Sequence, residues 1–422
     1  MIPSPPEEIA VLLQRPVAVF GGGVSGQGVL GLLSAIGGVG RLYDEKSPDA
    51  ENQFTAAHAG RHGLVVFSPG FSVEHPWLAT ARAAGCACLG ELDFASLFWR
   101  GEIMAITGTN GKTTLTEFLT HALVLAGRPA HKAGNIGYSL SRFVLEQSGR
   151  VEVAVCEVSS FQAETLQHLS PNVTFWTNFA EDHLERHPGM RAYFAAKWRL
   201  AERTPTDSVF AGTSVQHYAN EFGYPLSATA CVPTEGQPDD PKLAGTVFAH
   251  YPQRENFLLA AAWWKRNGMP ESKLYQAARD FRLGPHRLAK VGVRREVVFW
   301  NDSKATNFHA VEAALATFPS PVFWIGGGKA KGGDLAGFAA RIAARLKHAF
   351  LIGETQPVLA EYLRARQLPV TLSASLGEAV QAAFALATKG DHILLSPGFA
   401  SFDMFRGYDD RGTQFETIVE NL

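Results

Sequence analysis

Short apolar runs alternate with segments of helical spacing along the whole chain. The apolar runs cover residues 17–20, 41–43, 64–67, 103–106, 153–157, 173–176, 297–299, 322–325, 350–352 and 392–395. Such runs, bounded by glycine, proline or polar residues, are typical of buried strands. Helical spacing follows or precedes them, for example up to Leu33, from Leu115 onward and over residues 257–264. This alternation predicts an α/β protein with mostly parallel sheets.

The chain has 422 residues, more than one hydrophobic core accommodates, so we expect several domains. We expect a Rossmann-like N-terminal domain over 1–98, a central P-loop ATPase-like parallel-sheet domain over 99–284 and a C-terminal Rossmann-like α/β domain over 285–422. The Gly-Pro pair at 284–285 is a candidate hinge. Between 213 and 250 periodicity is weak and Pro, Gly and Thr are frequent, which predicts short strands and loops.

Composition narrows the classes of partner. Hydrophobic residues make up 46% and charged residues 18% of the chain, as in a soluble globular protein. A net charge of −2 gives no electrostatic reason to expect nucleic acid or a membrane surface as a partner. The four cysteines form neither a disulfide framework nor a zinc-spaced set, which favours the cytoplasm. Residues 1–8 contain Pro and Glu where a signal peptide would be basic and apolar, and no apolar run would span a bilayer.

Residues 108–114 read Gly-Thr-Asn-Gly-Lys-Thr-Thr and lie between an expected strand and an expected helix. In such a turn, backbone N–H groups and a helix N-terminus hold phosphate oxygens, the lysine neutralises the terminal phosphates, and a hydroxyl binds Mg²⁺. Ile106 stands where the general motif has an earlier glycine, so the match is partial. A plain strand-to-helix turn is the alternative, but the flanking elements favour ATP.

A second glycine-rich turn, Gly-x-Gly-x-x-Gly at residues 21–26, follows the first expected strand. Asp44 ends the next one. This is the layout of dinucleotide-binding domains, and tight packing between strand and helix is the alternative explanation for the glycines. Ser68 ends a further strand, and ligands collect at such carboxyl ends in open α/β sheets.

Several charged residues follow strands. Glu157 ends a strand and suits Mg²⁺, or else is an ordinary helix cap. Residues 177–187 hold three acids, two histidines and an arginine, and His183 directly after Asp182 favours a metal or substrate role. Lys197 lies in an apolar context, which by itself indicates a surface lysine with a buried stem. A partly buried lysine can instead have a depressed pKa.

The last segment has three polar stretches after strands. Residues 301–307, Asn-Asp-Ser-Lys-Ala-Thr-Asn, could begin a helix or hold a ribose and phosphate. Residues 326–334 form a glycine loop with Lys329 and Lys331, and residues 396–403 lead on to Tyr408. Cationic glycine loops at strand ends suit a small dianion.

Taken in this order, these stretches resemble the Mur ligase family, ATP-dependent amide-forming enzymes of peptidoglycan synthesis, from residue 21 to residue 415. The motif at 108–114 is specific to the superfamily, which includes folylpolyglutamate synthetases. The turn at 21–26, Glu181-Asp182-His183 with Arg186, and Ser401-Phe402-Asp403 point to the branch that joins D-glutamate to UDP-N-acetylmuramoyl-L-alanine. The resemblance implies a cytoplasmic monomer that acts through an acyl phosphate, with domains for the UDP substrate, ATP and the amino acid, in that order.

The resemblance also implies residue roles. Catalysis would rest on Lys112, Glu157, His183 and Lys197. One Mg²⁺ would bind to Thr113 and Glu157, and a second to His183 and a carbamylated Lys197. The UDP substrate would contact Val24, Ser25, Asp44, Glu45, Ser68, Asn135, Gly137 and Ser159. ATP would contact Gly108, Thr109, Asn110, Gly111, Lys112, Thr113, Thr114, Asn256, Arg287 and Asp302. Glutamate would contact Lys304, Thr306, Lys331, Ser401, Phe402 and Tyr408.

Three positions depart from the family pattern. Glu45 replaces a small hydroxyl residue, and Tyr408 and Leu335 each replace a phenylalanine, which leaves individual substrate contacts open. Residues 213–253 receive no role. Three other functions stay open: a related ligase that adds another amino acid such as L-glutamate, a nicotinamide-dependent dehydrogenase, and a nucleotide-binding scaffold without catalysis.

Overall fold

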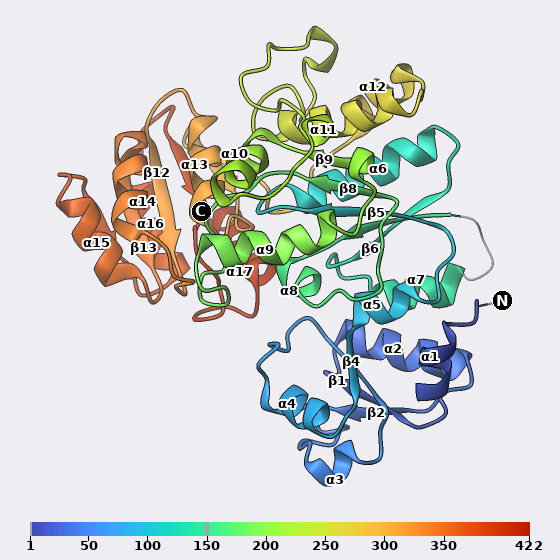
Figure 1. Ribbon diagram of the computed structural model, residues 1–422. Coiled ribbons are helices and arrows are strands. Elements are labelled where there is room, and N and C mark those ends of the chain that lie inside the picture. Colours follow the sequence, from blue (N-terminus) through green and yellow to red (C-terminus); the bar gives the residue numbers. More distant parts are fainter. Residues whose placement is uncertain (1, 148–151) are drawn as a thin grey trace. The chain divides into compact units, whose positions relative to one another are not determined.

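A computed structural model describes residues 2–147 and 152–422, and its strands form three sheets (Figure 1). The chain packs into two compact units. The first comprises Met1–Phe179 and Arg191–Phe281, and the second comprises Ala180–Met190 and Arg282–Leu422. The predicted α/β class is confirmed. The finer domain boundaries at 98/99 and 284/285 stay predictions.

The first sheet is wholly parallel, with strand order β2-β1-β3-β4. Its strands are β1 (Val17–Phe20), β2 (Gly40–Tyr43), β3 (Leu64–Phe67) and β4 (Ala87–Gly90). Its helices are α1 (Glu7–Leu12), α2 (Val24–Ala35), α3 (Ala56–Ala59), α4 (Pro76–Ala83) and α5 (Glu91–Ser96). Side chains alternate along β1: Val17 and Val19 face the α2 side, whereas Ala18 and Phe20 pack with residues of α3 and α4. Both faces are therefore buried, which explains the continuous apolar runs.

The second sheet is also parallel, with order β6-β7-β5-β8-β9. Its strands are β5 (Glu102–Thr107), β6 (Ala130–Gly134), β7 (Val153–Glu157), β8 (Val173–Trp176) and β9 (Val209–Ala211). Its helices are α6 (Lys112–Leu125), α7 (Leu140–Gln147), α8 (Ser160–Ala163), α9 (Met190–Ala201), α10 (Thr213–Phe222), α11 (Gln253–Arg266) and α12 (Glu271–Asp280). Because β5 is central, the loop that follows it lies in the middle of the sheet's carboxyl edge.

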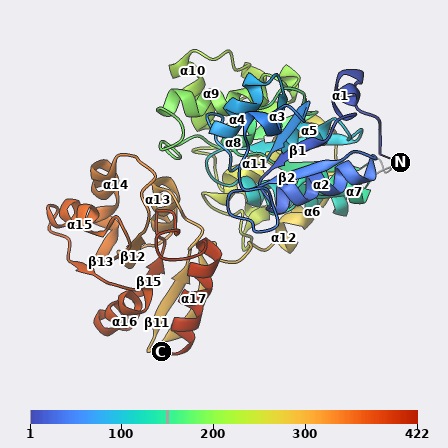
Figure 2. The same ribbon diagram turned by 90° about the horizontal axis from the view of Figure 1, so that it is seen from below.

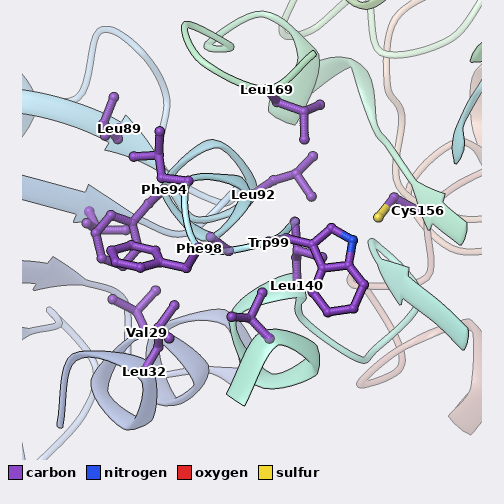
Figure 3. Packing of buried hydrophobic residues seen from close by; sticks show 14 of the residues in the cluster. Val29, Leu32, Leu89, Leu92, Phe94, Phe98, Trp99, Leu140, Cys156 and Leu169 are labelled. Atoms are coloured by element: carbon purple, nitrogen blue, oxygen red, sulfur yellow. The ribbon is translucent and has the colours of Figure 1, made fainter. Parts of the chain in front are cut away.

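The first two sheets share one hydrophobic core. In Figure 1, α2, α5 and α7 lie between them, and Figure 3 shows their side chains interdigitated. Val29 of α2, Phe94 of α5 and Leu140 of α7 are 0–1% exposed. The ring centroids of Trp99 and Phe143 lie 4.7 Å apart. This continuous core joins the two sheets into one body.

Two buried acids of α5 strengthen this junction. Glu91 accepts hydrogen bonds from the backbone N–H and the hydroxyl of Ser141, both at 2.7 Å. Asp93 accepts three backbone N–H groups, from residues 167, 168 and 169, at 2.8–2.9 Å. Hydrogen bonds to a buried carboxylate are strong and directional. They fix the carboxyl edge of the first sheet relative to the second.

The third sheet has order β10-β11-β15-β12-β13-β14, with β10 antiparallel and the rest parallel. Its strands are β10 (Ala289–Arg294), β11 (Val297–Asn301), β12 (Val322–Gly327), β13 (Leu346–Ile352), β14 (Val370–Leu372) and β15 (His392–Leu395). Its helices are α13 (Phe308–Ala316), α14 (Leu335–Ile342), α15 (Gln356–Arg364), α16 (Leu376–Leu386) and α17 (Tyr408–Glu420). Figure 2 shows α14 and α15 on one face of this sheet and α16 and α17 on the other, as the two hydrophobic clusters require.

The structure corrects the prediction for 213–250. Residues Thr213–Phe222 form a helix instead of short strands and loops. This helix fully buries only Val215 and Ala219, one turn apart, so its apolar periodicity is faint. It ends at Gly223, whose φ of +76° lies in the left-handed region typical of helix ends. Beyond it the chain forms loops with short 3₁₀ turns at Ala228–Ala230 and Pro241–Leu243.

Two edge strands of the third sheet, β10 and β14, have no counterpart in the prediction. Both are half-exposed, with no fully buried residue. Within the described residues, no helix combines the length and apolar character needed to cross a bilayer.

Candidate active site

The loop after β5 has two glycines in left-handed backbone conformations. Gly108 has a φ of +142°, and a Cβ there would lie 1.9 Å from the Thr177 hydroxyl oxygen. Gly111, the N-cap of α6, has a φ of +81°, and a Cβ there would lie 2.7 Å from the Asn256 Oδ1. Neither position tolerates a side chain, so the sequence requirement for glycine is steric. The same closeness places Asn256 of α11, an expected ATP contact, directly beside the loop.

Residues at the end of β8 hold this loop in shape. The backbone N–H of Thr109 donates to the Asn178 carbonyl at 3.1 Å, and that of Asn110 donates to the Asn178 Oδ1 at 2.9 Å. The Thr177 hydroxyl donates to the Asn110 carbonyl at 2.6 Å. Neither Thr177 nor Asn178 was predicted as a site residue. The available signal was their position directly after the strand that neighbours β5.

Two lysines converge on one carbonyl of the loop. Lys112 Nζ donates to the carbonyls of Gly108 at 3.0 Å and Thr109 at 2.8 Å. Lys197 Nζ donates to the same Gly108 carbonyl at 2.8 Å and lies 4.9 Å from the Tyr193 ring centroid. Lys197 is only 1% exposed, so its interpretation as a surface lysine is wrong. The structure therefore brings Lys197 to the phosphate loop from α9.

Glu157 ends β7, and its Cα pairs with that of Ile106 in the neighbouring strand. Its Oε1 accepts from Asn135 Nδ2 at 3.1 Å, whereas its buried Oε2 has no hydrogen-bond partner among the described residues. The helix-cap interpretation is wrong, because Ser159 caps α8. An orphaned carboxylate oxygen beside a phosphate loop fits a hard cation such as Mg²⁺. Thr113, in the first turn of α6, could supply a second oxygen ligand.

Metal binding here would have to combine different ligand types. Across residues 2–147 and 152–422, no group of three or more His, Cys, Asp and Glu side chains is arranged to hold a metal ion. The expected first site pairs one carboxylate with one hydroxyl, and Mg²⁺ commonly completes its shell with water and substrate phosphates.

The residues expected at the muramoyl end lie on the same sheet edge. Asn135 follows β6, and its backbone N–H donates to the Glu157 carbonyl at 2.9 Å. Gly137 has a φ of +80° in the turn after it. The Ser159 hydroxyl accepts the Gln162 backbone N–H at 3.2 Å at the start of α8.

The expected UDP contacts gather at the carboxyl edge of the first sheet. Asp44 accepts the backbone N–H groups of Gly22 at 2.6 Å and Lys46 at 2.8 Å, and these bonds lower the pKa of its carboxyl. The Ser68 hydroxyl reaches the Gly21 carbonyl at 3.5 Å. Asp44 therefore orders the glycine turn itself.

The other UDP candidates are more exposed. Val24 and Ser25 begin α2, and Val24 is 55% exposed. Glu45 Oε1 lies 3.7 Å from His75 Nε2. A Cβ at Gly26 would lie 1.8 Å from the Gly21 carbonyl oxygen. The glycines thus serve tight strand-to-helix packing, which does not exclude a ligand at the same turn.

In the second unit, Asp302 and Arg287 lie together. Asp302 accepts from the Ser396 hydroxyl at 2.8 Å and from the Leu288 backbone N–H at 3.0 Å. Burial raises the pKa of Asp302 to about 7, against the opposing effect of these bonds and of Arg287. His286 and Leu288, on either side of Arg287, have φ values of +59° and +48°. This unusual backbone fixes the direction of the segment that carries Arg287.

Two expected glutamate contacts, Thr306 and Lys331, line one open pocket with an empty volume of about 280 Å³. Glu181 and Asp182, from the segment Ala180–Met190, line it as well. Lys331 Nζ pairs with Asp182 Oδ1 at 3.3 Å, and Asn307 Nδ2 donates to Asp182 Oδ2 at 3.0 Å. In this open pocket the Lys331 cation and the Thr306 hydroxyl suit a carboxylate, and the two acids suit the ammonium group of an amino acid.

The remaining glutamate candidates lie on neighbouring loops. Lys304 Nζ stands 4.8 Å from the Tyr408 ring centroid. Ser401 is buried, and Phe402, in contrast, is 71% exposed. Ser401 follows Phe399, which lines the pocket.

His183 has a φ of +54°, and its Nδ1 lies 3.2 Å from the Glu185 Oε1. It belongs to the second unit and Lys197 to the first. A shared Mg²⁺ between them stays a prediction.

Comparison with protein families matches two parts of the chain. Residues 106–231 match the Mur ligase middle domain, and residues 286–399 match the Mur ligase glutamate ligase domain. The UDP-N-acetylmuramoylalanine–D-glutamate ligase of Gloeobacter violaceus is 35% identical, over 96% of this chain and 99% of that protein. The enzyme of the same name from Chlamydia pneumoniae is 36% identical over 85% of each chain.

Solved structures show a similar fold. A UDP-N-acetylmuramate-alanine ligase from Thermotoga maritima has a TM-score of 0.60 at 15% identity. The superposition covers 96% of this chain and 99% of that protein. A pseudomurein peptide ligase from Methanothermus fervidus gives the same four values. At this identity the likeness concerns the fold alone.

Proposed function

Because this chain belongs to the Mur ligase family, we propose that it forms an amide bond between UDP-N-acetylmuramoyl-L-alanine and D-glutamate at the expense of ATP. The reaction would contribute a peptidoglycan precursor. The identity with D-glutamate ligases over nearly the whole chain supports the choice of substrates. Membership of this family leaves the dehydrogenase and the non-catalytic scaffold without support.

One observation carries the proposal: the carboxyl edge of the second sheet combines a glycine loop, two ammonium groups and a buried orphan carboxylate oxygen. The loop's backbone N–H groups and the start of α6 suit phosphate oxygens. Lys112 lies over the loop, where it would neutralise charge on the terminal phosphates. Asn256, beside Gly111, would contact the nucleotide from α11.

The chemistry requires no protein nucleophile. The carboxylate oxygen of the UDP substrate attacks the γ-phosphorus of ATP, and ADP leaves, so an acyl phosphate forms. The neutral amine of glutamate attacks the acyl carbon, and the tetrahedral intermediate collapses with loss of phosphate and a proton. The protein's contribution is to position three ligands and to neutralise charge. Lys331, Thr306 and Lys304 would orient the glutamate carboxylates in the second unit.

Mg²⁺ held by Thr113 and Glu157 would neutralise charge that develops on the phosphoryl oxygens. We further propose a second Mg²⁺ that involves His183 and a carbamate on Lys197. Carbamylation would turn the Lys197 cation into an anionic oxygen ligand.

The function is tested by ADP release from ATP, Mg²⁺ and UDP-N-acetylmuramoyl-L-alanine with D-glutamate, with L-glutamate in parallel. We expect turnover with the D-enantiomer. Lys112→Ala should lower the rate roughly 1,000-fold, as loss of a transition-state charge contact does. Lys265→Ala, an exposed lysine of α11, should leave it unchanged. Substantial turnover by the Lys112 variant, with an unchanged melting temperature, would contradict the proposed role of the loop.

The carbamate has its own test. Protein incubated with isotopically labelled bicarbonate should show a carbamate carbon signal by NMR at neutral or mildly alkaline pH. Lys197→Arg should abolish that signal, because a guanidinium does not form this carbamate. A signal that persists in the variant, or that is missing from the unaltered protein, would rule out modification of Lys197.

A further inference from the structure

Arg411, in the first turn of α17, has a fully buried guanidinium that the proposed chemistry does not use. The residue is 0% exposed. Within the described part of the chain, no carboxylate forms an ion pair with it. Burial lowers the pKa of Arg411 to about 10, which still leaves it charged at neutral pH. The Asp403 carboxylate opposes part of this lowering of the pKa. A buried charge disfavours folding unless opposite charge and hydrogen bonds compensate it, so the hydrogen bonds of Arg411 are essential to its burial.

The guanidinium joins two loops through oxygen acceptors. Nε donates to the Ser303 hydroxyl at 3.0 Å, and Nη2 donates to the Ser303 carbonyl at 2.8 Å. Nη1 and Nη2 both reach the Phe399 carbonyl, at 3.3 and 3.4 Å. The planar fork of arginine makes such divergent bonds from a fixed geometry, which a lysine cannot reproduce.

Both loops carry expected contacts for the amino acid. Ser303 directly precedes Lys304, and its hydroxyl donates to the Tyr408 carbonyl at 2.7 Å. Phe399 lines the pocket with Thr306 and Lys331, and Ser401 follows two residues later. The Arg411 bonds therefore help to set the separation between the loop with Lys304 and Thr306 and the loop with Ser401. Two direct bonds act with them: the Ser396 hydroxyl donates to Asp302 at 2.8 Å, and the Gly398 backbone N–H donates to the Ala305 carbonyl at 2.9 Å.

We propose that Arg411 is a positioning residue for the amino-acid substrate, which it serves by locking the 301–307 and 396–403 loops at a fixed distance. This inference rests on the proposed function. It assigns Arg411 no contact with substrate. Its effect should therefore be larger on the KM for glutamate than on the KM for ATP, because the 108–114 loop and Asn256 belong to the first unit. Of the expected ATP contacts, Asp302 alone lies in the two loops that Arg411 joins.

The test compares Arg411→Met, Arg411→Lys and Ser303→Ala in the full chain, with the other substrates saturating. Arg411→Met should raise the KM for D-glutamate about 10-fold or more, since several hydrogen bonds are lost together. The KM for ATP should rise clearly less than the KM for D-glutamate. Arg411→Lys, which keeps the charge without the fork, should restore the KM only in part. Exposed Arg345→Met should match the unaltered protein.

Ser303→Ala is the milder variant. It removes the hydroxyl that accepts from Arg411 Nε and donates to the Tyr408 carbonyl, and it leaves the bond from Arg411 to the Ser303 carbonyl intact. If Arg411→Met does not fold, Ser303→Ala decides. A rise in its KM for glutamate without a matching rise in its KM for ATP supports the inference. Equal changes in the KM values for ATP, the UDP substrate and glutamate, or no change in any of them, would overturn the inference. Absence of ADP release by the unaltered protein would instead defeat the proposed function, and the inference with it.

Discussion

At the scale of single residues, two ammonium groups donate to the one carbonyl oxygen of Gly108. Like charges that share an acceptor repel each other, most strongly where water is scarce. Conversion of the Lys197 amine to a carbamate would replace this repulsion by attraction between Lys112 and an anion. The contact thus gives a physical reason to expect modification at one of the two amines, and the proposed second Mg²⁺ site assigns it to Lys197.

Glu157→Gln tests the orphan oxygen. Glutamine keeps the shape and the oxygen that accepts from Asn135, but it replaces the buried Oε2 with an uncharged amide. Loss of outer-shell support for a metal costs about 10–100-fold, so loss of a ligand should cost at least that much in activity. The Mg²⁺ concentration for half-maximal rate should rise correspondingly.

The control for this variant is Glu202→Gln, an exposed acid in the same unit. It should behave like the unaltered protein. A normal Mg²⁺ titration for Glu157→Gln would remove Glu157 from the metal site.

The sequence indicated the phosphate loop and Glu157 because strand, glycine turn and helix follow one another locally. It did not indicate Thr177, Asn178 or Arg411 as important, because their partners lie far away in the chain. Arg411, for example, meets Ser303 across more than a hundred residues. Burial of a charge is set by tertiary packing, and no local pattern reports it. The same holds for Lys197, whose apolar neighbours could not distinguish a surface position from an enclosed one.

At the scale of elements, α2 approaches α7 closely because Gly28 has no side chain. A Cβ at Gly28 would lie 2.3 Å from the Ser139 Oγ and 3.3 Å from the Arg142 backbone nitrogen. A Cβ at Gly31 in the same helix would contact only Leu145 Cδ2, at 3.2 Å. The two glycines therefore form a matched pair.

Gly28→Ala should be less stable than Gly31→Ala by roughly 1–3 kcal/mol. Both substitutions gain similar helix propensity, but only the first overpacks a helix junction. Thermal unfolding compares the two variants directly. Equal melting temperatures would mean that α7 yields to the added methyl group.

Most elements with both faces or one long face buried were predictable, and most of those with few buried residues were not. The buried strands β1, β3, β7, β8 and β15 were found at their observed positions. The edge strands β4, β6, β9, β10 and β14 and the helix α10 were missed. All of them except β9 are partly exposed and carry little hydrophobic periodicity, and β9 is buried but only three residues long.

At the scale of the molecule, the chain enters the second unit twice. It first supplies Ala180–Met190 and then, after returning to the first unit, Arg282–Leu422. Polar contacts join the short segment to the long one. Asp182 forms an ion pair with Lys331 and accepts a hydrogen bond from Asn307, and Glu181 accepts the Asp334 backbone N–H at 3.3 Å.

A fragment of residues 282–422 should therefore gain stability from a synthetic peptide of residues 180–190. Binding to the folded form raises the melting temperature, here by about 4 °C for a gain near 1 kcal/mol. The same peptide with Asp182→Asn should have a smaller effect, because it loses the charge that pairs with Lys331. Identical effects of both peptides would assign the stabilisation to other residues of the segment.

The double entry also means that one nick in the backbone cannot release either unit whole. Cleavage near residue 281 would leave Ala180–Met190, which packs in the second unit, covalently attached to the fragment that carries the first unit. Proteases should thus find no site in this region whose cutting yields two self-sufficient halves, and dissecting the protein into working parts requires a graft rather than a truncation.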